Sequence, residues 1–376
     1  MVNGPVNRQS ILVTGGAGFV GSAVVDRLVA DGHDVRVVDV LHPGAHASRP
    51  DYLSAGAEYL WGDLADPDIA RRAVAGVESV CHQASMVGLG ADFADVTDFA
   101  HHNVVATAQL LRALHERAFR GRIVLAGSMV VYGEGAYRCA VHGPVGAPTR
   151  RLDDLERGCF DPGCPRCGET LAVVRVDEAA PMQPRSVYAA TKLHQEHLCD
   201  AYGREHGVPV LALRYHNVYG PRMPASSPYS GVAAIFRSAY EEGRSPLVYE
   251  DGGQLRDFVH VDDVATANVR ALQAAAHVTG ACNVATGEQH TVLELAQALR
   301  DAIPGAPAPS VTGVWRAGDV RHVLAATGRA ARVLGFRARV PFAEGVREFA
   351  GAPLRPAAPS AQSAQSVVAT GSVPSP

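Results

Sequence analysis

The chain lacks an excess of positive charge, and it lacks any long apolar run. Its formal net charge is −4 and its pI is near 6.5, whereas nucleic acids and anionic membranes attract clustered Lys and Arg. No apolar stretch approaches the length of a membrane span, and the first residues do not have the shape of a signal peptide. We therefore expect a cytoplasmic protein with neither nucleic acid nor membrane as a partner.

Cysteine is also scarce, with seven residues in a chain of 376. In a reducing compartment these are thiols or metal ligands rather than a disulfide framework. Apolar residues make up 47% and charged residues 19% of the chain, an ordinary globular mixture for one or two domains.

Short apolar runs alternate with helical patterns along the first half of the chain. This alternation predicts an α/β fold, a Rossmann doubly wound parallel sheet covered by helices on both faces. The predicted strands are 11–13, 34–38, 58–61, 79–82, 122–126 and 209–213, and the predicted helices are 22–31, 66–75, 98–117 and 188–205.

The pattern changes twice further on. Residues 133–184 are rich in Gly, Pro, Arg and Cys and interrupt the alternation, so we interpret them as an insertion. The predicted division is a dinucleotide-binding domain (1–213), an interleaved smaller C-terminal α/β substrate-binding region (214–350), with helices near 232–242 and 261–276, and a disordered tail (351–376).

A glycine-rich turn follows the first predicted strand and opens a helix. In Gly15-x-x-Gly18-x-x-Gly21, the first glycine makes the turn, the second admits a pyrophosphate and the third lets helix and strand pack closely. Phe19 and Val20 belong to the same loop, at the helix N-terminus that would hold the pyrophosphate. The first spacing differs from the dehydrogenase fingerprint, so a plain turn is the alternative.

Two carboxylates follow the next strands. Asp39 ends the second strand, where it can accept hydrogen bonds from an adenosine ribose and repel a 2′-phosphate, which favours NAD over NADP. Asp63 and Leu64 follow the third strand. Asp63 either contacts the adenine or caps the helix 66–75.

Tyr188 and Lys192 are four residues apart, on one face of a predicted helix. A nearby ammonium, together with a positive nicotinamide, lowers the pKa of a phenol, which then accepts a proton from a sugar hydroxyl as hydride leaves the same carbon. Ser128 lies at the carboxyl edge of the sheet, where ligands of such folds bind.

These motifs together resemble the extended short-chain dehydrogenase/reductase superfamily, in its NAD-dependent nucleotide-sugar epimerase/dehydratase branch. The resemblance covers about residues 10–349, through segments 14–21, 82–85, 128–133, 188–192, 214–222 and 256–263. It implies cofactor contacts from Ala84, Asn103 and Lys192, and substrate contacts from Ser128, Asn217, Val232, Arg256, Arg316 and Asp319.

The residues after Ser128 bear on the reaction. Members of this branch that eliminate water carry an Asp-Glu pair there, and decarboxylases carry a Glu, whereas this chain has Met129 and Val130. An apolar pair cannot transfer protons, which leaves 4-epimerisation with a tightly bound NAD that is regenerated in each cycle. The alternatives are an NAD(P)H-dependent 4-keto-sugar reductase and a non-catalytic NAD(H)-binding sensor.

The insertion resembles that of dTDP-L-rhamnose 4-epimerase-like proteins, as do segments 188–198 and 228–236. This resemblance implies dTDP-L-rhamnose and dTDP-6-deoxy-L-talose as the substrate pair. It also implies a homodimer through the helices 98–117 and 188–205, with simple packing of these helices on the sheet as the alternative.

Within the insertion, Cys164-x-x-Cys167 has the spacing of a zinc knuckle. Cys159 is a candidate third ligand, with Cys139 or His142 as the fourth. A structural zinc and free thiols in a lid remain alternatives, because the sequence has no second Cys-x-x-Cys pair. Cys81, Cys199 and Cys282 lie in apolar patterns and are expected in the core.

Overall fold

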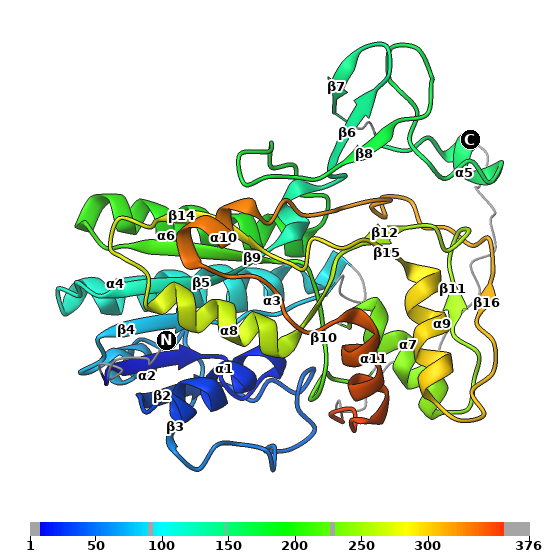
Figure 1. Cartoon of the computed structure of the whole chain (residues 1–376). Coiled ribbons are helices and arrows are strands. Elements are labelled where there is room, and N and C mark those ends of the chain that lie inside the picture. The colour runs from blue at the N-terminus through cyan, green and yellow to red at the C-terminus, as the bar shows by residue number, and fades with distance from the viewer. Residues whose placement is uncertain (1–7, 89–92, 147–148, 226–229, 357–376) are drawn as a thin grey trace.

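The computed structural model describes residues 8–88, 93–146, 149–225 and 230–356. A seven-stranded parallel sheet forms its centre, in the order β14-β9-β5-β4-β1-β2-β3 (Figure 1). The strands are β1 (Ser10–Thr14), β2 (Asp34–Asp39), β3 (Ala57–Trp61), β4 (Ser79–His82), β5 (Arg122–Ser128), β9 (Val210–Tyr215) and β14 (Gly280–Val284). The predicted Rossmann sheet is confirmed, although β14 was not among the predicted strands.

Helices cover both faces of the sheet because successive side chains along each strand point to opposite sides. In β1, Ile11 and Val13 join one core cluster and Leu12 joins another. The first cluster includes α1 (Phe19–Ala30), α8 (Val261–Leu272) and α10 (Gly328–Leu334), and the second includes α2 (Pro67–Val74), α4 (Ala106–Glu116) and α6 (Val187–His206).

Capping residues fix where the two helices near the predicted site begin. The Ser186 side chain accepts a hydrogen bond from the Ala189 amide at the start of α6. Asp66 caps α2 through the amides of Asp68 and Ile69. The alternative of Asp63 as the cap of this helix is therefore wrong, since Asp66 is nearer to the first turn and carries the same acceptor group.

The predicted helix 98–117 is one continuous helix with a wide turn in it. It follows η1 (Phe93–Asp95) and runs through α3 (Val96–Phe99), the π-helical segment η2 (Ala100–Val105) and α4. Such π-helical turns are rare and occur mostly at functional sites. This one carries Asn103, whose side chain is fully buried.

The C-terminal region shares the central sheet through β14 and α8, and it adds a third core of its own. That core is formed by α7, α9 and α11 and lies beside the carboxyl edge of the sheet (Figure 1). Its elements are β10 (Asn217–Tyr219), α7 (Val232–Glu241), β11 (Leu247–Val248), β12 (Leu255–Arg256), β13 (Phe258–His260), β15 (His290–Thr291), α9 (Val292–Ala302), β16 (Ser310–Val311) and α11 (Phe342–Gly351).

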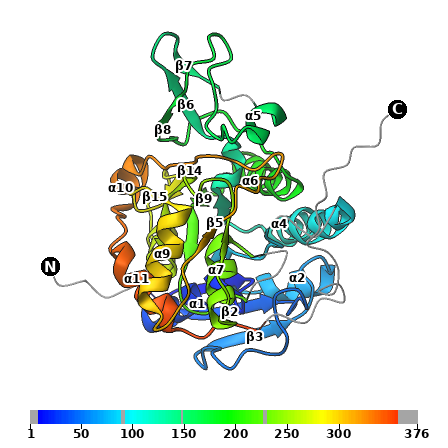
Figure 2. The same cartoon turned by 90° about the vertical axis from the view of Figure 1, so that its right-hand side faces the viewer.

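The insertion forms a separate lobe that stands above the body of the molecule (Figures 1 and 2). A three-stranded antiparallel sheet in the order β7-β6-β8 is its main element. After β5, the short helix η3 (Met129–Tyr132) leads to β6 (Ala136–Cys139), β7 (Gly143–Val145), α5 (Leu152–Glu156) and β8 (Ala172–Val174).

The predicted disordered tail 351–376 is wrong at its beginning. Gly351 ends α11, and Arg355 is buried and forms a β-bridge with Pro224. Burial of the Arg355 side chain against the glycine-rich turn orders this stretch, a contact that composition does not reveal. Residues 357–376 lie outside the described residues. Among the described helices, none is long and apolar enough to cross a membrane.

Candidate active site

One cavity of about 1370 Å³ runs along the carboxyl edge of the sheet. It exceeds the roughly 300–1,000 Å³ of a pocket for one small ligand, so it has room for two ligands side by side. One end is lined by the glycine-rich turn and Asp39, the middle by Ser128 and Tyr188, and the other end by Arg256.

The glycine-rich turn is built as its spacing predicts. Gly15 has a φ of +66°, and a Cβ there would lie 2.7 Å from the Ala84 backbone. A Cβ at Gly21 would lie 2.1 Å from the Gly15 carbonyl oxygen. Gly18 is the N-cap of α1, with no side chain over the first turn, so the helix N-terminus is open toward the cavity. This turn therefore fits a pyrophosphate.

Asp39 lies at the rim of the same turn. Its carboxylate accepts hydrogen bonds from the amides of Ala17 (3.0 Å) and Leu41 (2.8 Å), and burial raises its pKa. Arg355, which sequence reasoning missed, donates to the Ala17 carbonyl (3.4 Å) and to the Tyr52 hydroxyl (3.1 Å). The buried end of the chain thus braces the turn that carries the predicted cofactor site.

Most of the other predicted cofactor residues line the cavity, but Asn103 does not. Asp63, Leu64 and Ala84 line the cavity, as do Phe19 and Val20. Asp63 also pairs with His101 at 2.7 Å. Asn103 is not among the described residues that line the cavity, although it bonds to Ser85 and Met86, which do, so its assignment as a cofactor contact stays a prediction. The Asn103 side-chain oxygen accepts a hydrogen bond from the Met86 amide, and its side-chain nitrogen donates to the Met86 carbonyl and the Thr191 hydroxyl.

Ser128 and Tyr188 both line the cavity, and the Ser128 side chain is close enough to the Tyr188 phenol to influence its pKa. Burial raises the pKa of Tyr188 to about 12, and Ser128 opposes that shift. The predicted lowering of this pKa, which requires Lys192 together with the positive nicotinamide, stays a prediction, because Lys192 alone is not among the causes of the shift. The Lys192 ammonium donates instead to Gln195 (2.7 Å) and Ser85 (3.5 Å), so desolvation of the phenol decides the direction.

Lys192 is the single lysine among 34 lysine and arginine residues of the chain. It is 3% exposed, and burial lowers its pKa to about 8, against the opposing effect of Glu196. An arginine could not reach this state, since its guanidinium stays charged. The one lysine of the chain therefore stands where an amine of adjustable charge is useful, on the cavity wall beside Tyr188.

Asn217 and Arg256 lie on the cavity wall at the far end. The Arg256 guanidinium is held by the carbonyls of Arg321 (2.8 Å) and Val320 (2.6 Å) and by its neighbour Leu255 (2.8 Å). Two of its five N–H groups are left over. The Oδ1 atom of Asn217 is buried and has no hydrogen-bond partner among the described residues. Both side chains thus retain capacity for a polar ligand.

Three more predicted substrate residues line this end. Val232 begins α7, which has Gly231 as N-cap and no side-chain cap, so its first amides favour an anion. Arg316 is exposed and lies over the Tyr249 ring, 4.8 Å from the ring centroid. Burial raises the pKa of Asp319. Of the segment 228–236 quoted above, residues 228 and 229 lie outside the described residues.

Met129 and Val130 also line the cavity, directly after Ser128. Their place beside the Ser128–Tyr188 pair is where the resemblance puts the acid and base of eliminating enzymes. Neither side chain carries a titratable group, so this wall of the site contacts a substrate but transfers no proton.

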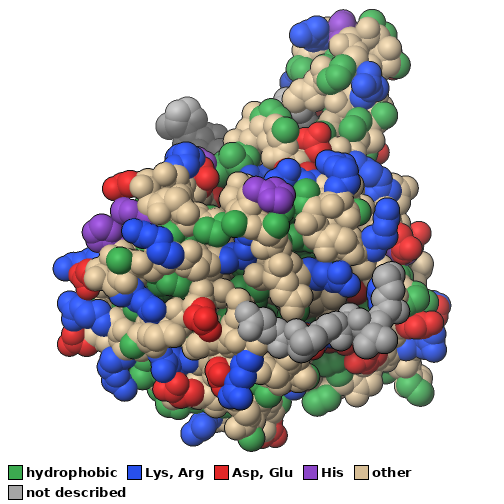
Figure 3. All heavy atoms as spheres, turned by 60° about the vertical axis from the view of Figure 1, so that its left-hand side comes forward, with side chains coloured by type: hydrophobic (Ala, Val, Ile, Leu, Met, Phe, Trp, Pro, Cys, Tyr) green, Lys and Arg blue, Asp and Glu red, His purple; other side chains and the backbone are tan. Residues whose placement is uncertain are grey.

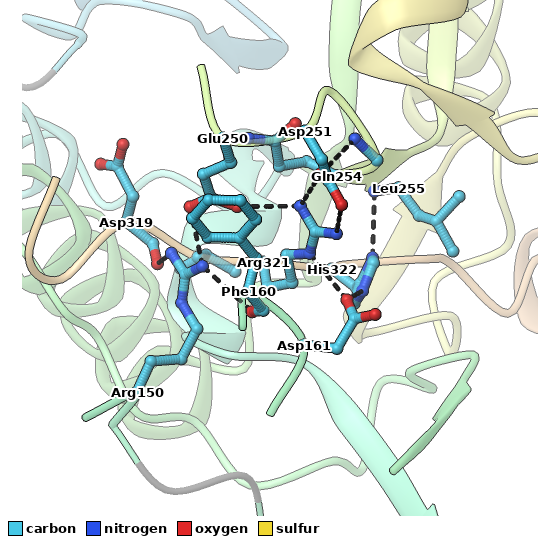
Figure 4. A network of polar contacts seen from close by, with 12 residues as sticks. Arg150, Phe160, Asp161, Glu250, Asp251, Gln254, Leu255, Asp319, Arg321 and His322 are labelled. Atoms are coloured by element: carbon cyan, nitrogen blue, oxygen red, sulfur yellow. Dashed lines mark hydrogen bonds and ion pairs between the residues drawn. The ribbon is translucent and has the colours of Figure 1, made fainter. Parts of the chain in front are cut away.

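An ion-pair network that sequence reasoning missed connects the insertion to the substrate end (Figure 4). Glu250 accepts from Arg150 (2.7 Å) and Arg321 (2.8 Å), and all three side chains are at most 4% exposed. Arg321 also bonds to Asp161 and Asp251, at 2.8 and 2.7 Å. Arg150 and Asp161 belong to the insertion, whereas Glu250 lines the cavity. The lobe therefore supports the cavity wall.

The cysteines are arranged differently from the sequence prediction. Cys81, Cys199 and Cys282 are buried, as predicted. Cys159 is exposed. In the part of the chain that the structure describes, the group around Cys164 and Cys167 contains Cys139 and His142 but not Cys159. Cys159 as a ligand is therefore corrected: its amide bonds to the Asp154 carbonyl at the end of α5, which fixes it away from the group.

Comparisons with known proteins agree with this geometry. The model of the NAD dependent epimerase/dehydratase family matches residues 11–150 and 168–285. The chain is 35% identical over 350 residues to the dTDP-L-rhamnose 4-epimerase of Burkholderia thailandensis, covering 92% of this chain and 94% of that relative.

Two solved structures are similar over nearly their whole length. The UDP-glucose 4-epimerase of Thermotoga maritima, solved with UDP-glucose, has a TM-score of 0.74 at 27% identity, covering 91% of this chain and 97% of that one. The Thermus thermophilus UDP-glucose 4-epimerase, solved with NAD, has a TM-score of 0.71 at 30% identity, with 91% and 97% covered. The chain belongs to the NAD-dependent epimerase/dehydratase family.

Proposed function

We propose that the protein is an NAD-dependent 4-epimerase of a nucleotide-activated hexose. The observation that carries this proposal is the Ser128–Tyr188 pair beside Met129 and Val130. The pair can remove and return a hydroxyl proton, and the apolar neighbours offer no acid or base for elimination. The relatives named above, which epimerise at carbon 4 by their titles, support the same reaction.

Tyr188 acts as the proton acceptor and donor for the sugar hydroxyl, and Ser128 orients that hydroxyl. Because burial raises the pKa of Tyr188 to about 12, the phenol needs a positive neighbour to release its proton near neutral pH. NAD, when bound, supplies that charge and accepts and returns the hydride. Lys192 lies where it can bind the nicotinamide ribose and support the same shift.

The residues present fit NAD. A Cβ at Gly15 would collide with the Ala84 backbone, and a Cβ at Gly21 would collide with the Gly15 carbonyl oxygen. The N-terminus of α1 faces the cavity without a side-chain cap. Asp39 can accept hydrogen bonds from the adenosine ribose, with Asp63 and Leu64 near the adenine. Ala84 would contact the cofactor from the loop after β4. A tightly held NAD follows if the hydride returns in every cycle.

For the substrate, we propose dTDP-L-rhamnose, converted to dTDP-6-deoxy-L-talose. The support is the relative at 35% identity and the insertion that resembles its subfamily. Arg256 and Asn217 would hold the diphosphate with the first turn of α7 at Val232, and Arg316 and Asp319 would hold the nucleoside. UDP-glucose 4-epimerases are similar too, so the base and sugar are decided by experiment.

We assign residues 1–213 to NAD binding and 214–350 to the nucleotide sugar, with 133–184 as the inserted lobe. We also propose a homodimer through α4 and α6. These helices lie side by side on one face of the sheet (Figure 2), and Val105, just before α4, is 48% exposed. Sizing chromatography checks the dimer, which a monomeric elution would exclude.

A substrate panel tests the reaction. Purified protein is incubated with dTDP-, UDP- and GDP-sugars without added cofactor, and products are separated by anion exchange. The proposal expects interconversion of C4 epimers, fastest with dTDP-L-rhamnose. A reductase would turn over only 4-keto-sugars with added NAD(P)H, and a sensor would turn over none of them.

A further inference from the structure

Four metal-binding side chains converge in the inserted lobe, away from the active site. The Sγ atoms of Cys139, Cys164 and Cys167 and a ring nitrogen of His142 all lie within 4.8 Å of one another. Within the described chain, none of the four lines the active-site cavity. We propose that this lobe binds one structural zinc ion through Cys139, His142, Cys164 and Cys167.

The distances between these atoms match a tetrahedral zinc site. With Zn–S near 2.3 Å and Zn–N near 2.0–2.1 Å, the edges of a tetrahedron are about 3.8 Å between sulfurs and about 3.6 Å between sulfur and nitrogen. Cys139 Sγ and Cys167 Sγ are 3.7 Å apart, and His142 Nδ1 lies 3.6 Å from Cys139 Sγ and 3.5 Å from Cys164 Sγ. A disulfide would need about 2.05 Å, so these sulfurs are not bonded to each other.

The four ligands come from two matching turns. In each turn the ligands are three residues apart and a glycine follows: Cys139-x-x-His142-Gly143 and Cys164-x-x-Cys167-Gly168. Both glycines have positive φ, +70° and +79°. Such a turn points its two ligand side chains at a common centre, and two of them complete a tetrahedral set. The sequence prediction named Cys139 and His142 only as alternatives to each other, because the first turn has histidine in place of the second cysteine.

The apolar core around these four side chains is small. The apolar cluster of the lobe has four buried members, of which two are ligands, Cys139 and Cys164; Tyr137 and Leu171 are the others. So small a core does not hold a fold of this size without a disulfide or a metal. Its cysteines form no disulfide. A metal cross-link between the β6–β7 turn and the loop before β8 supplies the missing stability.

Zinc fits this donor set better than other metals. Thiolate and imidazole together favour zinc, whereas calcium and magnesium prefer oxygen ligands. Four protein ligands fill a tetrahedral site and leave no open position for water, so the ion is structural rather than catalytic. The family model leaves residues 151–167 unmatched, so Cys164 and Cys167 are outside the pattern that the family shares.

The site is connected to the substrate end by a short stretch of chain. Cys164 follows Asp161, which pairs with Arg321 at 2.8 Å and with His322 at 3.0 Å (Figure 4). The lobe otherwise projects from the body of the molecule (Figure 3). Zinc therefore fixes the segment that holds Arg321 against Glu250, and its loss is expected to weaken substrate binding while leaving NAD in place.

The direct test measures the metal in the full-length protein, purified without a histidine tag and without chelator. Elemental analysis should find one zinc per chain, and X-ray absorption should find three sulfurs near 2.3 Å and one nitrogen near 2.0 Å. Protein grown with added zinc that contains less than a tenth of an equivalent would overturn the proposal. This outcome is independent of the epimerase activity.

Single substitutions assign the ligands. Cys167→Ser and His142→Ala should each lose at least nine-tenths of the zinc and expose residues 133–184 to limited proteolysis. Cys159→Ser is the matched control in the same lobe and should keep its zinc. His142→Cys should also retain it, as a four-cysteine site. Equal zinc loss in the Cys159 and Cys167 variants would contradict the ligand set. If the variants do not fold, the absorption spectrum of the wild type still decides.

Discussion

The two ends of the active-site cavity are built by different means. The cofactor end consists of residues close together in sequence, the turn Gly15–Gly21 with Asp39 on the next strand. The substrate end depends on ion pairs between segments far apart, such as Arg150 with Glu250 and Glu250 with Arg321. A short motif specifies the turn of the first end, which Arg355 also contacts, whereas the second end forms only when the lobe and the C-terminal region meet.

The largest loss of activity is expected from a substitution at Tyr188, between the cofactor end and the substrate end of the cavity. Tyr188→Phe removes the group that takes the hydroxyl proton, so kcat should fall by about 10²–10⁴-fold. Bound NAD should stay at the wild-type level, because the change leaves the glycine-rich turn intact. Tyr202→Phe on the same helix, also buried, serves as the control and should retain turnover. Comparable losses in the two variants would remove Tyr188 from its role.

The second prediction is a substitution that disrupts NAD binding at the cofactor end and leaves the substrate end intact. In Gly21→Ala the new Cβ would lie 2.1 Å from the Gly15 carbonyl oxygen, so the turn must open. We expect bound NAD to fall below about a tenth of the wild-type content, while a nucleoside diphosphate still binds, as measured by calorimetry. Gly351→Ala, where nothing lies within 4 Å of the added atom, should change neither. NAD retained by Gly21→Ala would mean that the turn is not the cofactor site.

A smaller change is expected from a substitution that weakens substrate binding and leaves the cofactor end intact. The buried Glu250 carboxylate pairs with Arg150 and Arg321, and Arg150→Met removes the first of these two partners. We expect KM for the nucleotide sugar to rise about tenfold, equal to about 1.4 kcal/mol, with NAD content unchanged. Arg157→Met in the same lobe removes an exposed pair with Asp154 and should have little effect. A rise in KM of the same size in both variants would disconnect the network from the substrate.

The smallest expected effect is the dependence of stability on the protonation of the Lys192 amine. Lys192 is the only lysine, so reductive methylation with ¹³C labels it and the N-terminal amine, and Lys192→Arg identifies its NMR signal. Burial lowers the Lys192 pKa to about 8 from the usual 10.5. Since the folded state binds this proton less tightly, stability should rise between about pH 8 and 10.5 and be unaffected below. A titration near 10.5 would show that the amine is solvated.

The geometry of the glycine-rich turn could be predicted from the sequence because its constraints are local. Strand, glycine turn, helix and a carboxylate follow one another within thirty residues, and Tyr188 and Lys192 share one helical face. The pairing of Arg150 with Glu250 could not be predicted, since nothing in either neighbourhood marks the other. Arg355 was assigned to a disordered tail on composition, although its side chain is buried against Ala17 and Tyr52.

Asn103 and Cys159 show the same limit at single residues. Asn103 lies in a segment with helical periodicity, and that periodicity does not reveal the π-helical turn that carries it or its hydrogen bonds to Met86 and Thr191. Cys159 is closer in sequence to Cys164 than Cys139 is, yet the antiparallel pairing of β6 and β8 brings Cys139 and His142 to Cys164 and Cys167. Distance along the chain misled the assignment of Cys159, whereas the assignment of Asn103 came from the family resemblance.

The most direct test of the account follows the sugar proton at carbon 4. Purified protein is mixed with dTDP-L-rhamnose in D₂O, without added NAD(H), and monitored by ¹H NMR. The account predicts a second sugar with inverted configuration at C4 and with its H4 signal at full intensity, because the same hydride returns to the opposite face. Deuterium at C4, or turnover only with added NADH, would contradict it.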